Sequence, residues 1–410
     1  MPLTRRQIYR RRRATVIGSV ALVLGVLAYL PMTLLAPVEQ VAAAEAPYTA
    51  PVPAPTELDF PDYGASAIAV VDDDGMLGTG GSEEPLPMAS ITKVITALVV
   101  LDANPLAGDE AGPSVTMTPA DVASHDAFAA VGGSVVPVQS GWQFSQRDLV
   151  ELTVVRSANN YATSLAHWAF GDDAGFVAAT DAWLAEQGLE NTTLVEPTGL
   201  SDDNRATASD LIELGRIALA DPLISSIVNV RSIEVPHLGE MPATNRMLGE
   251  LGIDGIKTGT LYDIVNLLFS STFEVGGETV SVVGVILGAP GPDRGILNTD
   301  VLDLLRTTQA GFSEVVLVSA GEEFGSYSTE WGQSTTAVAD RDVRVPMWHT
   351  DTIDATIELD RIGVAEAGSA AGEAVFTVGE KTVSTPLVLT GAITDPGPGW
   401  RLTNPFTLLG

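Results

Sequence analysis

The sequence predicts an α+β fold, with an antiparallel sheet and a helical region, a small β-rich C-terminal domain and an N-terminal membrane segment. Three observations predict this fold. Stretches with helical periodicity fill the middle of the chain, strand-like stretches lie on both sides of them, and one long apolar stretch stands near the N-terminus. A helical middle flanked by strands favours an antiparallel sheet, because parallel α/β folds alternate strands and helices throughout.

The composition describes a folded, strongly acidic protein. Of 410 residues, 45% are hydrophobic and 18% charged, so the chain can build more than one core. The formal net charge is -31, and such a surface repels phosphate backbones, which argues against nucleic-acid binding. The chain has no cysteine, and its four histidines are scattered, so we expect no thiol chemistry, no metal site and no cofactor.

The N-terminus combines a basic segment, residues 1–13, with a nearly unbroken apolar stretch at residues 14–36. The positive-inside rule leaves the basic segment in the cytoplasm and exports the rest of the chain. As a helix, the apolar stretch spans about 35 Å, enough for the hydrocarbon core of a bilayer. Pro31 interrupts it, and Ala42-Ala43-Ala44 resembles a cleavage site, so anchor and cleaved signal peptide both stay open.

The next segments predict a spacer and a first folded domain. Residues 37–61 are rich in alanine and proline and predict an extended spacer. We expect the domain itself over residues 62–320, opening with a strand at 65–71. Its helices are predicted at 90–104, 146–155, 160–170 and 210–220.

The chain then changes from helical to strand-like periodicity. Strands are predicted at 255–260, 265–275 and 278–288, and Gly276-Gly277 joins the last two as a hairpin. A helix at 299–311 closes the domain. Past residue 339 every predicted element is a strand, at 343–348, 355–360, 374–378 and 382–389. Residues 339–410 therefore predict the β-rich C-terminal domain.

A serine and a lysine stand three residues apart at the start of the first predicted helix. This spacing places Ser90 and Lys93 on one face, about 5–6 Å apart at Cβ. A neutral lysine amine can take the proton of a serine hydroxyl and activate it, if burial or a nearby cation lowers its pKa from about 10.4. The structural alternative has Ser90 capping the helix and Lys93 extending along an apolar face to water.

Two further motifs follow in the chain. Ser157-Ala158-Asn159 stands at a junction of two helices, where a serine can relay a proton and an asparagine can bind an amide. Equally, the segment can be a capping turn at Asn159 or Asn160. Lys257-Thr258-Gly259 stands on a strand, where glycine admits another backbone and the other two can hold a carboxylate. Its alternative is a glycine-broken strand with a solvated lysine. The chain has only three lysines, and two of them fall in these motifs.

In this order the motifs resemble those of the active-site-serine penicillin-recognising enzymes, S-x-x-K, S-x-N and K-T-G. More narrowly, the chain resembles the D-alanyl-D-alanine carboxypeptidases, which are low-molecular-mass penicillin-binding proteins. The resemblance runs from about residue 62 to 315 and implies the penicillin-recognising serine transferase fold shared with β-lactamases. The supporting stretches are 87–93, 157–160, 197–200, 207–211, 244–245 and 254–259.

The resemblance also implies an activity and its catalytic residues. Ser90 is the acylated nucleophile, Lys93 its general base, and Ser157 and Asn159 serve proton transfer and amide binding. The enzyme removes the terminal D-alanine from peptidoglycan stem peptides outside the cytoplasm of a bacterium, and β-lactam antibiotics acylate the same serine. Whether water or the amine of a neighbouring stem peptide accepts the acyl group stays open.

Substrate binding is implied for the third motif and its surroundings. Lys257, Thr258 and Gly259 line the strand that the substrate extends. The backbone N–H groups of the nucleophile and of Thr260 form the oxyanion hole. Arg246 is our candidate for binding the terminal carboxylate.

The sequence departs from the family pattern at two places, and two alternative functions remain. Asn160 stands where the pattern usually has aspartate, and the residues after Thr260, Leu261-Tyr262-Asp263, are less typical. A class A type β-lactamase needs a glutamate and an asparagine around a deacylating water, and Glu196 has Leu200 where that asparagine is expected. A non-catalytic peptidoglycan-binding module is the second alternative, which the intact motifs disfavour.

Overall fold

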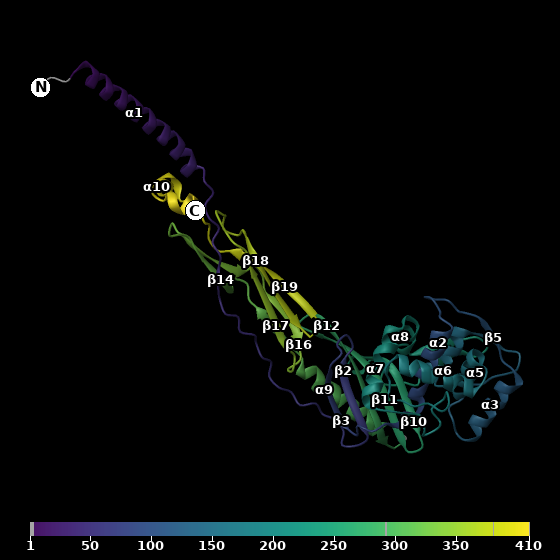
Figure 1. Ribbon diagram of the computed structural model, residues 1–410. Coiled ribbons are helices and arrows are strands. Elements are labelled where there is room, and N and C mark those ends of the chain that lie inside the picture. The colour runs from purple at the N-terminus through teal and green to yellow at the C-terminus, as the bar shows by residue number, and fades with distance from the viewer. Residues whose placement is uncertain (1–3, 292, 380, 410) are drawn as a thin grey trace. The chain divides into compact units, whose positions relative to one another are not determined.

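The computed structural model describes residues 4–291, 293–379 and 381–409, and the chain divides into two compact units (Figure 1). Unit 1 consists of Met1–Val52, Val315–Val345 and Asp351–Gly410. Unit 2 consists of Pro53–Glu314 and Pro346–Thr350 and contains all three predicted motifs. The α+β prediction is confirmed, with an antiparallel sheet in each unit.

Unit 2 is built on a five-stranded antiparallel sheet in the order β10-β11-β12-β2-β3. The strands are β2 (Ala65–Val70), β3 (Met76–Gly81), β10 (Ile253–Leu261), β11 (Ile264–Val275) and β12 (Glu278–Pro290). Gly276 and Gly277 form the predicted hairpin turn, both with positive φ. Only β3 escaped prediction, because its three glycines hide a strand pattern.

Helices cover both faces of this sheet because successive strand residues point to opposite sides. On β2, Ala67 and Ala69 pack with α7 (Ala208–Ala220), whereas Ile68 packs with α9 (Gly295–Gly311). Gly215 lets α7 approach closely, since a Cβ there would lie 2.4 Å from a methyl group of Val283. The sheet is therefore the middle layer of unit 2.

The other helices of unit 2 gather beside α7 in one bundle (Figure 1). They are η1 (Ala89–Ile91), α2 (Thr92–Ala103), α3 (Pro119–Ala130), α4 (Gln146–Val154), α5 (Asn159–Phe170), α6 (Asp173–Glu186) and α8 (Pro222–Val228). The predictions of α2, α4 and α5 are confirmed. The sequence did not reveal α3, which buries no residue and so carries no apolar stripe.

Several short elements lie between the longer helices and strands. They are the pairs β4 (Leu86–Pro87) with β7 (Arg205–Ala206), β5 (Ser114–Thr116) with β6 (Gln143–Ser145), β8 (Ser232–Val235) with β9 (Gly239–Pro242), and the turn η2 (Glu250–Gly252). A further two-stranded sheet pairs β13 (Ser313–Val318) with β16 (Val343–Met347).

Unit 1 contains a six-stranded sheet in the order β1-β14-β15-β19-β18-β17. Its strands are β1 (Ala44–Glu45), β14 (Glu323–Ser328), β15 (Ser334–Ala339), β17 (Ile353–Leu359), β18 (Ala370–Val378) and β19 (Lys381–Leu389). The segment 37–61, predicted as an extended spacer, is part of this sheet at its start. There β1 pairs with β14, and the Tyr48 hydroxyl donates to the Leu317 carbonyl. Backbone hydrogen bonding, which composition does not reveal, draws this segment onto the sheet.

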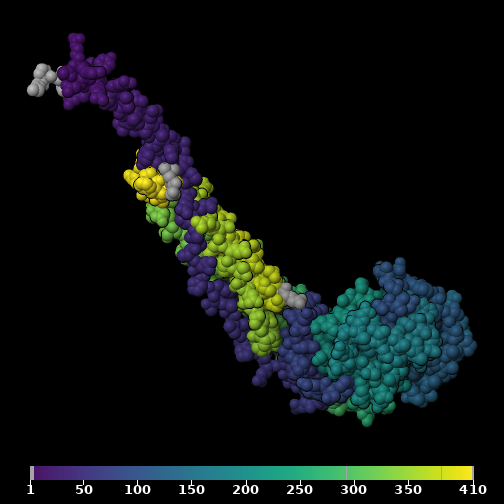
Figure 2. Space-filling view, in the orientation of Figure 1, coloured from purple at the N-terminus to yellow at the C-terminus, as the bar shows by residue number. Residues whose placement is uncertain are grey.

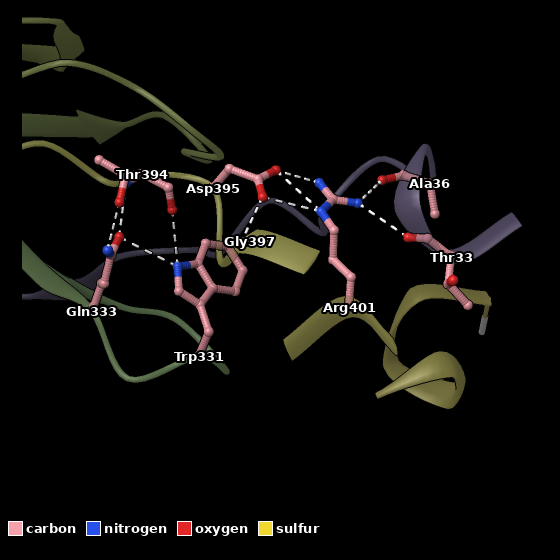
Figure 3. A network of polar contacts seen from close by, with 8 residues as sticks. All are labelled: Thr33, Ala36, Trp331, Gln333, Thr394, Asp395, Gly397 and Arg401. Atoms are coloured by element: carbon pink, nitrogen blue, oxygen red, sulfur yellow. Dashed lines mark hydrogen bonds and ion pairs between the residues drawn. The ribbon is translucent and has the colours of Figure 1, made fainter. Parts of the chain in front are cut away.

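The N-terminal segment forms the helix α1 (Arg5–Leu34), whose side chains are exposed along nearly its whole length (Figure 2). Within the described residues it is the one helix long and apolar enough to cross a membrane. Arg401 of α10 (Gly397–Thr403) donates to the carbonyls of Thr33 and Ala36, at the C-terminal end of α1. The same side chain forms an ion pair with Asp395 (Figure 3). A cation at this position stabilises a helix end. The short helix α11 (Pro405–Leu409) follows.

Candidate active site

The first motif places a serine hydroxyl beside a buried amine. Ser90 lies in η1 and Lys93 in the first turn of α2, and Lys93 Nζ is 3.0 Å from Ser90 Oγ. The same amine donates to the carbonyl oxygen of Thr198 at 2.5 Å. These contacts reject the structural alternative, in which the Lys93 side chain reaches water, because this residue is completely buried.

Burial gives this amine the acid-base character that a general base needs. It lowers the pKa of Lys93 to about 7, although the Glu196 carboxylate acts in the opposite direction. The physical cause is desolvation, which penalises the charged ammonium form. A substantial fraction of the amine is therefore neutral near pH 7 and can accept a proton from Ser90.

A loop anchored by Glu196 supports the lysine. The Glu196 carboxylate accepts backbone hydrogen bonds from Thr198 and Gly199, each at 2.7 Å, and a third from the Asn204 side chain. This arrangement fixes the Thr198 carbonyl that binds Lys93. Gly199 is required here, because a Cβ at this position would lie 1.9 Å from the Ala89 carbonyl oxygen. Both carboxylate oxygens of Glu196 thus serve the loop.

The second motif lies at the junction between the end of α4 and the start of α5. Ser157 has a positive φ of 56°, and Asn159 is the first residue of α5. Both side chains are more than nine-tenths buried and line the same cavity as Ser90. Asn160, the departure from the family pattern, exchanges two hydrogen bonds with the backbone of Val136. It therefore ties α5 to the neighbouring loop.

The third motif lies on the edge strand β10, next to the nucleophile. Lys257 is buried, and burial together with the positive charges of Lys93 and Arg294 lowers its pKa well below the ordinary value. Gly259 allows the close approach, since a Cβ there would lie 3.0 Å from the Met88 carbonyl and 3.2 Å from the Ala89 methyl. The free edge of β10 can pair with an extended peptide.

The structure brings a different arginine to the site from the one that the sequence suggested. Arg246 is exposed and is not among the residues that line the cavity. Arg294 does line it, and its guanidinium donates to the Gly259 carbonyl at 3.0 Å and to the Thr260 hydroxyl at 2.5 Å. Arg294 follows the end of β12, and only the folding of β11 and β12 returns it to the third motif. Its sequence neighbours gave no signal of this role.

All three motifs meet around one cavity of about 520 Å³. It is lined by Ser90, Val131, Gly132, Gly133, Ser134, Ser157, Asn159, Gly199, Leu200, Thr244, Thr258, Thr260, Leu261, Tyr262 and Arg294. Three basic groups, those of Lys93, Lys257 and Arg294, gather at this place in a chain of net charge -31. The Arg294 guanidinium, which lines the cavity, favours a substrate with an anionic end. The sequence singled out Thr244 only as part of a stretch that supports the family resemblance, and it did not single out Val131 or Ser134.

A comparison with protein families agrees with this geometry. The family model described as D-alanyl-D-alanine carboxypeptidase matches residues 56–291, more than half of the chain. The chain belongs to the D-alanyl-D-alanine carboxypeptidase family. The matched range lies within unit 2 and contains every residue of the cavity except Arg294.

Individual members of the family share part of this sequence. A D-alanyl-D-alanine endopeptidase of Escherichia coli is 34% identical over 145 residues, which are 35% of this chain and 44% of that protein. The carboxypeptidase DacC of the same organism is 28% identical over 57% of this chain and 58% of its own length. The chain thus spans about half the length of such curated relatives.

Solved structures support the fold. A peptidoglycan synthesis regulatory factor (PBP3) from Streptococcus pneumoniae superposes with a TM-score of 0.59 at 21% identity, covering 82% of this chain and 100% of that one. The fold expected from the motifs, the serine transferase fold of penicillin-binding proteins, is therefore confirmed.

Proposed function

We propose that this protein is a serine-type D-alanyl-D-alanine carboxypeptidase that removes the terminal D-alanine from peptidoglycan stem peptides. The observation that carries the proposal is the 3.0 Å contact between Ser90 Oγ and the buried amine of Lys93, whose pKa is lowered to about 7. A serine with an amine base of this kind forms acyl-enzymes. Family membership supports the same substrate class.

Acylation begins when Ser90 Oγ attacks the carbonyl carbon of the penultimate D-alanine. Lys93 Nζ takes the hydroxyl proton, and the backbone N–H groups of Ser90 and Thr260 stabilise the oxyanion. The carbon–nitrogen bond then breaks, Ser157 gives its hydroxyl proton to the leaving amine and takes one from the Lys93 ammonium, and free D-alanine departs, which leaves the Lys93 amine neutral again. Asn159 binds the amide of the acyl part.

Deacylation returns the enzyme to its starting state. A water molecule attacks the ester carbonyl, gives a proton to the Lys93 amine, and releases the shortened peptide from Ser90, which regains its hydroxyl proton. β-Lactam antibiotics present a strained amide to the same serine and acylate it. An amine of a neighbouring stem peptide in place of water would make the reaction a transpeptidation.

The terminal carboxylate of the substrate meets the basic cluster in this proposal. Arg294, Thr258 and Thr260 line the cavity, whereas the buried Lys257 amine donates to the Thr258 carbonyl at 3.1 Å. Charge-assisted hydrogen bonds of this kind are short and strong. We propose Arg294 in place of Arg246 as the carboxylate-binding arginine.

The two alternative functions find less support. A class A type β-lactamase uses its glutamate to activate a water, whereas the Glu196 oxygens accept hydrogen bonds from Thr198, Gly199 and Asn204. A non-catalytic binding module does not need a buried amine beside a serine, and burying an amine is unfavourable. The proposed carboxypeptidase accounts both for the hydrogen-bonded Glu196 carboxylate and for the buried amine beside Ser90.

We further propose that α1 remains as a membrane anchor and holds both units outside the cytoplasm. Arg401 supports retention because it donates to two carbonyls at the end of α1. The segment at 44–45 also pairs with β14, so cleavage after Ala44 would separate groups that bond within unit 1. A chain with an epitope tag at its N-terminus should keep the tag in the mature membrane fraction.

The direct test of the proposed function is product analysis. The chain without α1, incubated with diacetyl-L-lysyl-D-alanyl-D-alanine, should release free D-alanine over many turnovers. The coupled D-amino-acid oxidase reaction measures it. Binding of the tripeptide without any release would instead support the non-catalytic module.

Replacing the cavity arginine should weaken substrate binding. Arg294→Gln removes a charged donor, and we expect KM for the tripeptide to rise about 10- to 100-fold, as for the loss of a hydrogen bond to a charged group. Arg246→Gln is the matched control and should leave KM within about twofold. Steady-state kinetics on both variants checks this, and equal effects would contradict the assignment.

A further inference from the structure

Backbone strain in unit 2 gathers around the cavity. Six non-glycine residues among those described have positive φ, and three of them line the cavity: Ser157, Tyr262 and Arg294. A fourth, Ala89, directly precedes the nucleophile. Strained conformations persist where function requires them. Ser157 and Arg294 already have roles in the proposed reaction, whereas Tyr262 has none.

Tyr262 is an unfavourable choice for its position in the chain. It lies in the two-residue turn between β10 and β11, where Leu261 pairs with Ile264, and its φ is 52°. Glycine and asparagine adopt this conformation readily, while a bulky aromatic residue does so at a cost. Tyr262 is 76% exposed, so burial of its ring in the folded chain does not offset the free-energy cost of this backbone conformation. Its presence calls for a contact outside the chain itself.

The exposed apolar side chains of unit 2 point to the same place. Tyr262 at 76% and Val131 at 67% are the two most exposed of its described large apolar side chains, and both line the active-site cavity. Scattered exposed apolar residues are ordinary, but two at one cavity indicate a surface that a ligand covers. We call Tyr262 and Val131 the apolar rim.

The position of the rim along β10 indicates which part of a substrate reaches it. Thr258 and Thr260 lie on β10, Tyr262 lies in the turn directly after it, and all three line the cavity, so a peptide that pairs with this edge and continues past its end passes them in turn. Tyr262 stands four positions after Thr258, about 13 Å away at the rise of an extended chain. A dipeptide with its carboxylate at Thr258 and Arg294 spans about 7 Å and ends short of the rim.

We infer that Tyr262, together with Val131, is a specificity-determining residue that binds an aliphatic side chain preceding the terminal D-alanyl-D-alanine. This inference rests on the proposed function and names the part of the substrate that the apolar rim recognises. An aliphatic stem covers both rim residues and leaves its own polar end in water, as an acylated lysine does. A substrate without that side chain forgoes the contact.

Two substrates with the same reacting end test the inference. They are diacetyl-L-lysyl-D-alanyl-D-alanine, which reaches the apolar rim, and acetyl-D-alanyl-D-alanine, which does not. The measured quantity is the ratio of their kcat/KM values. For Tyr262→Gly we expect this ratio to fall about tenfold, because the substrate loses an apolar contact. Tyr262→Phe should keep it, and Ile296→Ser, which changes another exposed apolar residue outside the cavity, should also keep it.

A thermal melt separates binding from a structural role. Glycine relieves the backbone strain, so Tyr262→Gly should melt at the same temperature as the parent chain or higher. Tyr262→Asn provides a second variant that tolerates positive φ. A ratio unchanged in both variants overturns the inference while leaving the proposed function intact. A parent chain that hydrolyses neither substrate overturns both.

Discussion

Ser90→Ala should abolish acylation by penicillins and release of D-alanine, with a loss of about 10⁴-fold or more. The substitution removes the hydroxyl oxygen that contacts the Lys93 amine and that attacks the carbonyl in the proposed reaction. Lys93 still keeps its second partner, the Thr198 carbonyl, so the fold should persist. Mass spectrometry of the chain after incubation with a fluorescent penicillin measures the effect, as covalent mass gained per molecule.

A serine outside the cavity provides the control. Ser226 lies in α8, and its hydroxyl donates to the Leu223 carbonyl of the same helix. Ser226→Ala should be labelled as fully as the parent chain, and peptide mapping of the parent should find the label on Ser90. Label that persists in Ser90→Ala would refute the assignment of the nucleophile.

Lys93→Met should lower the acylation rate by about 10³-fold or more while keeping or raising the melting temperature. Methionine fills a similar volume but cannot accept the serine proton, and general-base catalysis contributes up to about 10⁴-fold. The substitution lowers activity but should not lower stability, because burial of an amine costs desolvation free energy and burial of methionine does not. Stopped-flow acylation and a thermal melt measure the two effects.

Two further variants sharpen this prediction. Lys93→Arg keeps a positive charge that cannot be lost near pH 7, so it should be as inactive as Lys93→Met. Lys381→Met changes the lysine of β19 in unit 1 and should leave acylation unchanged. Retained activity in Lys93→Met, or an equal loss in Lys381→Met, would mean that another group is the base.

The sequence predicted most of the secondary structure and much of the site, because both depend on local patterns. The spacing of Ser90 and Lys93 on one helical face follows from helix geometry, and their 3.0 Å contact agrees with it. The apolar period of 146–155 and 210–220 identified α4 and α7 because each helix buries one stripe. Glycine pairs likewise located the β11–β12 hairpin.

The features that the sequence did not reveal depend on long-range contacts. Arg294 reaches the third motif through the path of two strands, and its own neighbours carry no helical or strand pattern that indicates this. The packing of β1 on β14 joins residues 44–45 to 325–326, far away in the chain. The sequence indicated Tyr262 only as part of a departure from the family pattern. Its positive φ and its exposure follow from the folded chain.

The most direct test of the account is a nuclear magnetic resonance titration of the lysine side chains. With only three lysines, a chain without α1 labelled with ¹³C at the lysine ε carbon gives three resonances, which Lys93→Met and Lys381→Met assign. We expect the Lys93 signal to titrate near pH 7, because burial favours its neutral form, so that the amine is protonated below this pH and free to act as a base above it. A Lys93 signal that titrates near 10, as an exposed lysine does, would contradict the account.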